Sequence, residues 1–268
     1  MIRRVLLLLS IAALVSACSI KQFAVNVLGD ALAEGGGVYT SDDDPELIME
    51  AIPFGLKTYE SLLAESPEHV GLLLAAARGF TGYAYMLQDK ADRLDAHDLQ
   101  SARELRARAR NLYLRGRDYA LRGLDIAHPG FRAELRRDRA IALSLTDAHD
   151  LPFLYWAGVS WAGAVSTAKG DLRLIAELPF AAALVERVLE IDETYERGAA
   201  HEFFVAYEGG RPGGSPTDAR RHYERALELS EGASASVHLA LAESVALQEQ
   251  DLPEFRRLIA AARAIDPD

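Results

Sequence analysis

Cys18 is the only cysteine of this 268-residue chain, and the residues before it have the pattern of a bacterial export signal. Arg3 and Arg4 precede an apolar run over residues 5–15, and the small residues Ser16 and Ala17 stand directly before the cysteine. A basic start, a short apolar run and small residues at a cleavage site are typical of a secretory signal. A thiol directly after the cut is the group that receives diacylglycerol in bacterial lipoproteins. The pattern therefore predicts a cleaved signal peptide over residues 1–17 and a lipid anchor on Cys18.

Two alternatives to a lipid anchor are an ordinary secretory signal with an incidental cysteine and an uncleaved signal anchor. The apolar run of eleven residues is too short to cross about 30 Å of hydrocarbon, which argues against the signal anchor. A lipid on Cys18 would hold the mature chain at a bacterial membrane, facing the periplasm. Because serine rather than aspartate follows the cysteine, the outer membrane is favoured.

The pair His201-Glu202 invites the interpretation of a metal-dependent hydrolase. A zinc-binding helix of that class needs a second histidine four residues after the first, and that position is Val205. We therefore expect the two side chains to make a polar contact within a helix pair. No serine stands in a G-x-S-x-G elbow, and no thiol remains once Cys18 carries lipid. The sequence thus predicts no enzyme, and neither a bound metal nor a cofactor.

Aromatic residues gather in two segments that are also rich in glycine and alanine, residues 77–86 and 150–171. Small residues let a second helix backbone approach closely, while tryptophan and tyrosine combine apolar area with a hydrogen-bonding tip. Two interpretations stay open, a pocket or pore for an apolar ligand and the core of a tightly crossed helix pair. The residues predicted to contact a ligand or line a pore are Tyr83, Tyr155, Trp156 and Trp161.

Arginines are concentrated between residues 101 and 140, where eleven of them stand among five acidic residues. This basic band is unusual in a chain whose net charge is −11. A solvated helix face with i,i+4 pairs such as Glu104–Arg108 and Asp118–Arg122 would explain it. The other interpretation is a docking surface, for which the candidates are Arg103, Arg106, Arg110 and Arg117.

The overall charge and hydropathy limit the partners of the chain. A net charge of −11 argues against binding to nucleic acid. No segment after the signal approaches the length of an apolar membrane span, so the sequence predicts a soluble body. With its single thiol lipidated, that body has no disulfide and depends on packing for its stability.

The positions of these side chains are set by helices, because apolar residues recur at intervals of three and four and no run of alternating β-branched residues interrupts them. Residues 19–33 are predicted to form a first amphipathic helix, which belongs to an N-terminal anchor helix and linker over residues 18–44. Asp44 and Pro45 mark the next helix start, as N-cap and first-turn residue. Ser215 and Thr217 are the alternatives for a later cap. Residues 45–268 are predicted to form a single helical domain.

Several helices of this region end in the same way, with an apolar residue eight positions before a terminator. The terminators stand at positions 67, 129, 193, 231 and 267, and the last two intervals are close to the 34-residue tetratricopeptide repeat. The first two intervals are nearly twice as long and must contain extended or additional helices. The pattern predicts an all-α fold, an α-solenoid of cryptic tetratricopeptide-like antiparallel helix pairs. A helical bundle without true repeats is the alternative.

As a set, several segments of the chain resemble the TatT family, the lipoprotein T component associated with some tripartite ATP-independent periplasmic (TRAP) transporters. They include "AIPFGLKTYESLLAESPEHVGLLLAAARGFTGYAY", "LPFLYWAGVSWAGA" and "GAAHEFFVAYEGGRPGG". The resemblance implies a helical periplasmic lipoprotein that forms a homotrimer around a pore. It also implies the solute-binding subunit of the transporter as partner, with hydrophobic or organic-acid ligands. A structural scaffold lipoprotein that handles no solute is the alternative, and no catalytic residue carries over from the family.

Overall fold

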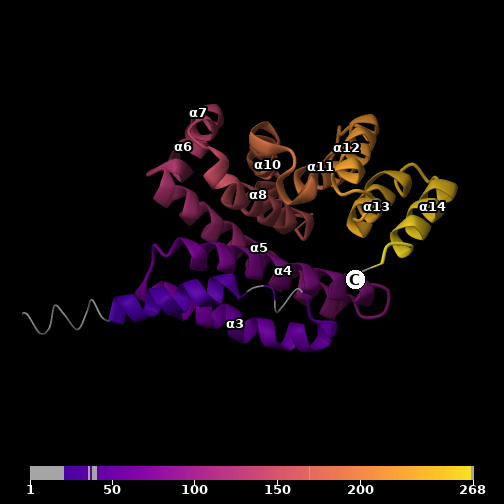
Figure 1. Ribbon diagram of the computed structural model, residues 1–268. Helices are drawn as coiled ribbons and strands as arrows, with labels where there is room; N and C mark the ends of the chain where they lie inside the picture. Colours follow the sequence, from indigo (N-terminus) through magenta and orange to yellow (C-terminus); the bar gives the residue numbers. More distant parts are fainter. Residues whose placement is uncertain (1–20, 36, 38–40, 169, 267–268) are drawn as a thin grey trace, which may run out of the picture. The chain divides into compact units, whose positions relative to one another are not determined.

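The computed structural model of the chain describes residues 21–35, 37, 41–168 and 170–266 (Figure 1). Cys18 and the predicted signal peptide lie outside the described residues. Within the described ranges every regular element is a helix, which confirms the predicted all-α fold. The arrangement as a solenoid stays a prediction.

The described chain divides into two compact units. The first contains the described residues up to Arg132 together with Gly163–Ile175, and the second contains Ala133–Ala162 and the residues from Ala176 onward. Helix α8 (Leu151–Ser166) contributes its last turn to the first unit and its other residues to the second. The expectation of a single domain over residues 45–268 stays a prediction.

The first unit is built from a helix over residues 21–34 and from three longer helices. These are α3 (Pro45–Glu65), α4 (Val70–Leu94) and α5 (Leu99–Ala127), with α4 and α5 packed side by side along their length (Figure 1). As predicted, Asp44 caps α3 by accepting a hydrogen bond from the backbone N–H of Leu47 at 2.9 Å, and Pro45 occupies the first turn. The rest of this unit is the short helix α9 (Leu172–Ile175) and its flanking residues.

Among the described helices, α4 is the one long and apolar enough to cross a membrane by length and composition. Half of its most apolar window is buried inside the protein, where Leu72, Leu73 and Phe80 are almost fully covered. Burial of this kind is typical of a core helix between its neighbours. The packing against α3 and α5 explains the apolar composition of α4.

The second unit begins with short helices and becomes more regular toward its end. Its elements are α6 (Phe131–Arg137), whose first two residues belong to the first unit, α7 (Arg139–Ser144), α10 (Leu178–Asp192), α11 (Ala199–Gly210), α12 (Pro216–Leu229), α13 (Ala235–Leu241), a π-helical turn at Ala242–Ala246, and α14 (Leu252–Arg263). The core of α11–α14 is built on Val205, Ala219, Leu241 and Leu258, each at most 1% exposed. Ser215 is the cap of α12, since its hydroxyl accepts the N–H of Asp218 at 3.1 Å.

The helices end close to the predicted terminators, because α3, α5, α10 and α12 stop at residues 65, 127, 192 and 229. The long intervals also have the predicted explanation. The first contains two extended helices of 25 and 29 residues, α4 and α5, and the second contains the additional helices from α6 to α9. The spacing between an apolar residue and each terminator thus predicted where these helices end, and the interval lengths predicted the extended and additional helices.

Candidate functional site

The four arginines predicted as a docking surface lie along α5 but have different environments. Arg106 bridges two carboxylates of the same helix hairpin, with Nη2 at 2.7 Å from Asp92 and Nη1 at 2.9 Å from Asp95. The hydrogen bond from Arg106 lowers the pKa of Asp95. Arg117 is mostly buried and binds Asp118 at 2.8 Å, whereas Arg103 is exposed. Arg106 therefore stabilises the hairpin, Arg117 is paired within α5, and Arg103 and Arg110 are more available to a partner.

Two arginines of the expected i,i+4 pairs make contacts between α5 and neighbouring segments. Arg108 donates to the hydroxyl of Tyr83 at 3.2 Å, and its guanidinium lies 5.5 Å from the centre of that ring. Arg122 donates to the carbonyl of Pro67 at 2.7 Å. Some arginines of the band therefore join α5 to neighbouring segments of the first unit.

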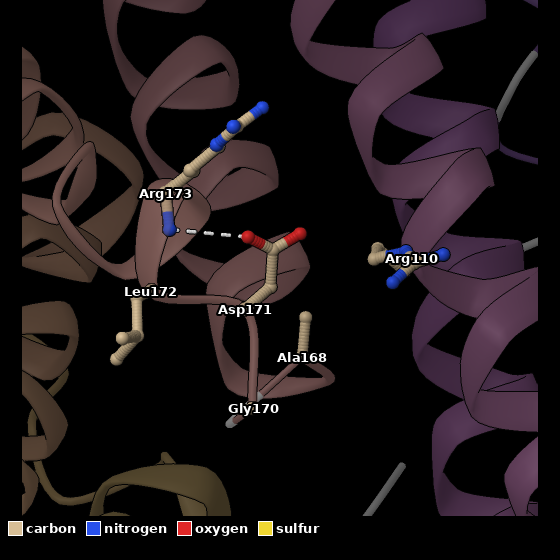
Figure 2. Close-up of a pocket in the computed structure, with 6 residues that line it drawn as sticks. All are labelled: Arg110, Ala168, Gly170, Asp171, Leu172 and Arg173. Atoms are coloured by element: carbon tan, nitrogen blue, oxygen red, sulfur yellow. Dashed lines mark hydrogen bonds between the residues drawn. The ribbon is translucent and has the colours of Figure 1, made fainter.

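Arg110 lies on the wall of a surface pocket of about 590 Å³ (Figure 2). The other side of the pocket is the segment before and within α9, which contributes Ala168, Gly170, Asp171, Leu172 and Arg173. The carboxylate of Asp171 accepts the backbone N–H groups of Arg173 and Leu174 at 3.1 and 3.2 Å. Its charge is therefore partly engaged in holding this segment in place.

The pocket combines two cations and the Asp171 carboxylate with apolar surface. Within the described part of the chain, neither the Arg110 nor the Arg173 guanidinium makes a hydrogen bond or ion pair. Leu172, 79% exposed, and Ala168 supply the apolar part. Guanidinium groups bind carboxylates through paired N–H donors, so this pocket can hold an organic acid with an aliphatic chain.

Trp161, predicted to contact a ligand, is 1% exposed and has its own partners inside the second unit. Its indole stacks on Phe180 with ring centres 5.6 Å apart, and its Nε1–H donates to Glu177 at 2.9 Å. These contacts are those of a core residue. Ligand contact by this side chain stays a prediction.

Tyr155 and Trp156, on the same helix α8, are partly buried and lie edge to face with ring centres 5.4 Å apart. Tyr155 also contacts Tyr195 at 5.7 Å, and burial raises the pKa of its hydroxyl. The fourth predicted residue, Tyr83, is 6% exposed and belongs to the first unit, where Arg108 covers it. Of the four predicted residues, Tyr155 and Trp156 contact each other within the second unit.

A second pocket, of about 660 Å³, lies on the second unit beside α7 and α10. Its wall includes Leu143, Ala182 and Ala183, with Glu186 and Tyr207 also lining it. Tyr155, Trp156 and Trp161 are not part of that lining. The predicted aromatic residues and this pocket are thus separate features of the second unit.

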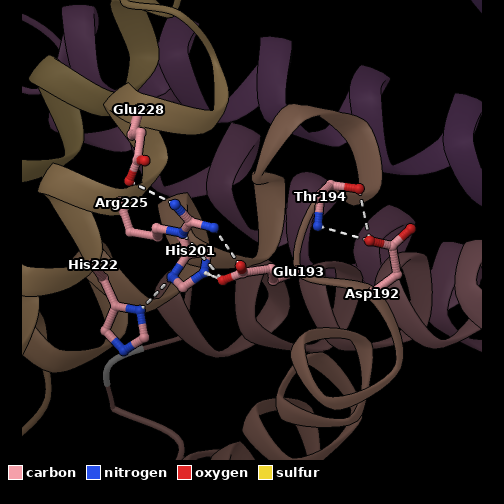
Figure 3. Close-up of polar contacts among 7 residues, drawn as sticks. All are labelled: Asp192, Glu193, Thr194, His201, His222, Arg225 and Glu228. Carbon is pink, nitrogen blue, oxygen red and sulfur yellow. Dashed lines mark hydrogen bonds and ion pairs between the residues drawn. The ribbon is translucent and has the colours of Figure 1, made fainter.

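His201 makes the predicted polar contact within a helix pair (Figure 3). Its Nδ1 lies 2.8 Å from Nδ1 of His222 on α12, and its Nε2 lies 3.2 Å from Glu193. Arg225 binds both oxygens of that Glu193 carboxylate and also Glu228. The other member of the sequence pair, Glu202, accepts from Ser236 at 2.9 Å on α13.

Electrostatics fix the charge of this cluster. The hydrogen bond from Arg225 lowers the pKa of Glu193 to about 2. Burial lowers the pKa of His222 to about 4, helped by the neighbouring His201, and burial also lowers the pKa of His201. At least one imidazole must be neutral with its proton on Nε2, because its Nδ1 has to accept the hydrogen bond that Nδ1–H of the other imidazole donates. The cluster is a structural contact between α10, α11 and α12, and no group of three or more metal-ligating side chains is found in the described ranges.

The sequence reasoning missed Arg173 and Asp171 in the first pocket, and Glu193, His222 and Arg225 in the polar cluster. For the pocket a signal was present, since Gly170-Asp171 before an apolar residue is a turn followed by a capping side chain. For the cluster no local signal existed, because its members come from three different helices.

Comparison with known proteins places the chain in a family. A family model described as the TRAP transporter T-component matches residues 41–268. A protein of Treponema pallidum (strain Nichols), described as an uncharacterized protein, is 28% identical over 277 residues, a stretch that covers 95% of this chain and 86% of that protein. The match covers the whole second unit and the first unit from residue 41 onward. This chain belongs to the TRAP transporter T-component family.

Proposed function

We propose that this chain is a non-enzymatic, lipid-anchored accessory component of a TRAP-type transporter that docks the periplasmic solute-binding subunit and passes it a ligand. The family match over residues 41–268 carries the proposal. The anchor is the lipid on Cys18 predicted from the residues before it, and the location is the periplasmic side of the envelope, at the outer membrane. The homotrimer around a pore is part of the same proposal.

An anchored protein needs little intrinsic affinity for a soluble partner in the same compartment. Confinement to a surface raises the effective concentration of the docking site. Arg103 and Arg110 are the arginines of α5 that suit a transient, charge-guided contact, because Arg106 and Arg117 are already bound to carboxylates of the same unit. A partner with an acidic docking surface would fit them.

The first pocket supports an organic acid as ligand, among the hydrophobic and organic-acid ligands considered. Arg110 and Arg173 would bind the carboxylate, and Leu172 would contact the aliphatic part. A single charge-assisted contact of this kind contributes about 1.5–3 kcal/mol, so its loss lowers affinity at least about tenfold.

The docking proposal is tested by native mass spectrometry of the mature chain mixed with a TRAP solute-binding protein from the same organism. A complex is expected, and the double substitution Arg103→Gln with Arg110→Gln is expected to weaken it. Arg93→Gln serves as control, because Arg93 is 78% exposed on the same unit and pairs with Asp89. Absence of a complex at high micromolar concentration would reject docking.

The ligand proposal is tested separately, by calorimetric titration of the purified chain with aliphatic monocarboxylates of increasing length. Arg173→Gln should reduce affinity about tenfold or more, while Arg93→Gln should leave it unchanged. Equal affinity of both variants would remove the pocket from the proposal.

The rival function is a scaffold lipoprotein of an envelope assembly that handles no solute. Genes for transporter membrane subunits next to this one favour the accessory role. Genes for envelope assembly in that position favour the scaffold.

A further inference from the structure

The first helix, residues 21–34, leaves a large part of its apolar surface exposed. Its inner face contains Gln22, Asn26, Gly29 and Ala33, spaced at four, three and four residues so that all lie on one side, and the partly buried Val25 and Leu32 flank them. Its outer face contains the exposed apolar residues Phe23, Ala24, Val27, Leu28 and Ala31, and the exposed Glu34 follows them on the same side in the last turn. A helix on a protein surface normally buries its apolar side.

Polar contacts hold the inner face against the start of α4. The amide of Gln22 donates to the hydroxyl of Ser66 at 3.2 Å, and that hydroxyl donates to Asn26 at 2.8 Å. Nε2 of His69 lies 3.2 Å from the carbonyl of Asn26. Gly29 allows the close approach, because a Cβ there would lie 2.7 Å from Nε2 of His69. The orientation of the helix is therefore fixed by the fold.

The outer face is left without cover by the rest of the described chain. Phe23 is 70% exposed, Val27 51% and Leu28 50%. Lys21 borders this face and pairs with Glu65 at 2.5 Å. The exposed surface is thus an apolar stripe beside a cation that is tied to the fold.

We propose that this outer face lies in the interface of the membrane that carries the lipid anchor, so that the first helix rests flat on the bilayer. The inference rests on the proposed lipidation of Cys18, and it goes beyond the proposed function by assigning a second membrane contact. It also orients the first unit, since the inner face then points away from the lipid.

The position of the face along the chain selects lipid as its occupant. Phe23 follows Cys18 by five residues, which span at most about 17 Å when fully extended and about 7 Å as a helix. The acylated cysteine is at the bilayer surface, so Phe23 cannot be far from the headgroups. An interfacial helix inserts its apolar side about 5–10 Å into that region.

The size of the face argues against a second protein molecule as its main occupant. Five side chains, two of them alanine, fall well below the roughly 20–30 residues a side of a stable protein interface. A lipid surface has no such threshold, because each exposed apolar side chain adds its own transfer free energy. The acyl chains already supply the affinity, and the helix supplies orientation.

The test uses the mature lipidated chain in vesicles of phosphatidylethanolamine and phosphatidylglycerol at a ratio of three to one. Because lipid occupies the Cys18 thiol, Val27→Cys introduces a single reactive thiol for an environment-sensitive fluorophore. Asp30→Cys is the matched control on the same helix, since Asp30 lies beside the inner face and is 69% exposed. Leu28→Cys is a second outer-face position, in case the first variant does not fold.

With vesicles, label at position 27 or 28 should shift to the blue and lose access to aqueous iodide about threefold or more, as expected for interfacial insertion. Label at position 30 should change less. Equal iodide access with and without vesicles would overturn the proposal although the chain floats with lipid. Protection before vesicles are added would also overturn it, since another copy would then cover the face. A chain that does not co-float with the vesicles lacks the lipid anchor, and this result would overturn both the inference and the proposed lipidation. The docking experiment described above tests a separate proposal and does not depend on this result.

Discussion

Each compact unit contains a stacked pair of aromatic rings under an arginine. In the first unit Phe80 stacks on Tyr119, with ring centres 5.6 Å apart and the Arg115 guanidinium 5.0 Å from the Phe80 centre. In the second unit Trp161 stacks on Phe180 at the same distance, with Arg139 at 5.2 Å from the Phe180 centre. One ring of each pair is almost fully buried, at 2% and 1% exposure for Phe80 and Trp161.

The two pairs differ in how the nearby charges are arranged. In the first unit the carboxylate of Glu60 accepts from Arg115 and Tyr119, both at 2.8 Å, and from Lys57 at 2.6 Å. Arg115 therefore both covers the Phe80 ring and pairs with the Glu60 carboxylate.

In the second unit these roles are divided. Arg139 donates to the carbonyl of Pro179 at 2.9 Å, while Glu177 accepts from Trp161 and has Arg136 at 3.7 Å. Both units therefore contain the same stacked aromatic pair. In the first unit the surrounding charged groups all meet at Glu60, whereas in the second unit they are spread over separate contacts. Burial of the aromatic pair should therefore contribute about equally to the stability of both units. The carboxylates Glu60 and Glu177 should contribute unequally.

The largest expected effects are those of Phe80→Ala and Trp161→Ala. Each should lower the free energy of unfolding by about 3–5 kcal/mol, because a large buried ring is replaced by a cavity. Urea unfolding followed by circular dichroism measures both losses. Phe54→Ala is the control, because Phe54 is 80% exposed and its loss should change stability by less than about 0.5 kcal/mol. If either substitution lowered the free energy of unfolding by less than about 1 kcal/mol, the two aromatic pairs would not stabilise their units in the same way.

Glycines on α8 give a second comparison between the units. A Cβ at Gly158 would lie 2.5 Å from Val185 and 2.8 Å from the carbonyl oxygen of Ala181, whereas one at Gly163 would lie 2.6 Å from the ring of Tyr113. Gly158→Ala and Gly163→Ala should each destabilise by about 1–3 kcal/mol through overpacking. Gly158→Ala should cost more, since a backbone carbonyl moves less readily than a ring.

Gly82→Ala on α4 is the matched control for these substitutions. Its Cβ would meet nothing within 4 Å, so the change should stabilise by up to about 1 kcal/mol through helix propensity. Thermal unfolding of the three variants ranks them. Equal tolerance at all three glycines would contradict the close helix contacts.

The helices of both units could be predicted because their signals are local. Asp44-Pro45 marks the start of α3 through a capping carboxylate and a restricted φ angle, and both act within one turn. The terminators likewise predicted the ends of α3, α5, α10 and α12. The division into two units was not predicted, because it depends on which helices pack together rather than on any one of them.

The candidate site was only partly predictable for the same reason. The arginine band is visible in the sequence, but the sequence does not show that Arg106 is bound by Asp92 and Asp95 while Arg110 reaches a pocket. Arginines three or four residues apart look alike until the neighbouring helix supplies acids to some of them. The partners of Trp161 and His201 come from other helices and could not be named.

Glu60→Gln and Glu177→Gln measure the difference in charge arrangement directly. Glu60→Gln should cost about 1–3 kcal/mol, because it leaves charged and hydrogen-bonded partners without their acceptor. Glu177→Gln should cost less, since its ion pair with Arg136 is longer and Arg136 is 61% exposed. Equal costs would show that the dispersed arrangement stabilises as much as the concentrated one.

The pH dependence of this effect has a definite sign. Burial raises the pKa of Glu60, but the hydrogen bonds from Lys57 and Tyr119 and the charge of Arg115 outweigh it, so the pKa is lowered. A lowered carboxyl pKa stabilises above the value of the unfolded chain and is lost as the pH falls through the folded value. Wild-type protein should therefore lose more stability than Glu60→Gln on acidification below about pH 4.5.

The smallest effect concerns histidines, and it should occur at higher pH and in the second unit. Burial, and then the charge of His201, lower the pKa of His222 from 6.5 to about 4. The unfolded chain therefore takes up protons between these values while the folded chain does not, and stability falls as the pH drops from 6.5 toward 4. Glu193, with its pKa lowered to about 2, stays ionised throughout this window and does not contribute to the change.

His222→Gln should flatten this dependence without removing the contact to His201, since an amide can also donate and accept. Between pH 7 and pH 5 the wild type should lose about 1 kcal/mol more than the variant, after allowance for the solvent that reaches this partly exposed ring. Urea unfolding at the two pH values measures the difference, and His97→Gln, at an exposed position of the first unit, is the control. If both variants lose as much as the wild type, titration of the His201–His222 contact does not distinguish the units. If His222→Gln alone is flatter, the second unit responds to pH in a range where the Glu60 network of the first unit remains intact.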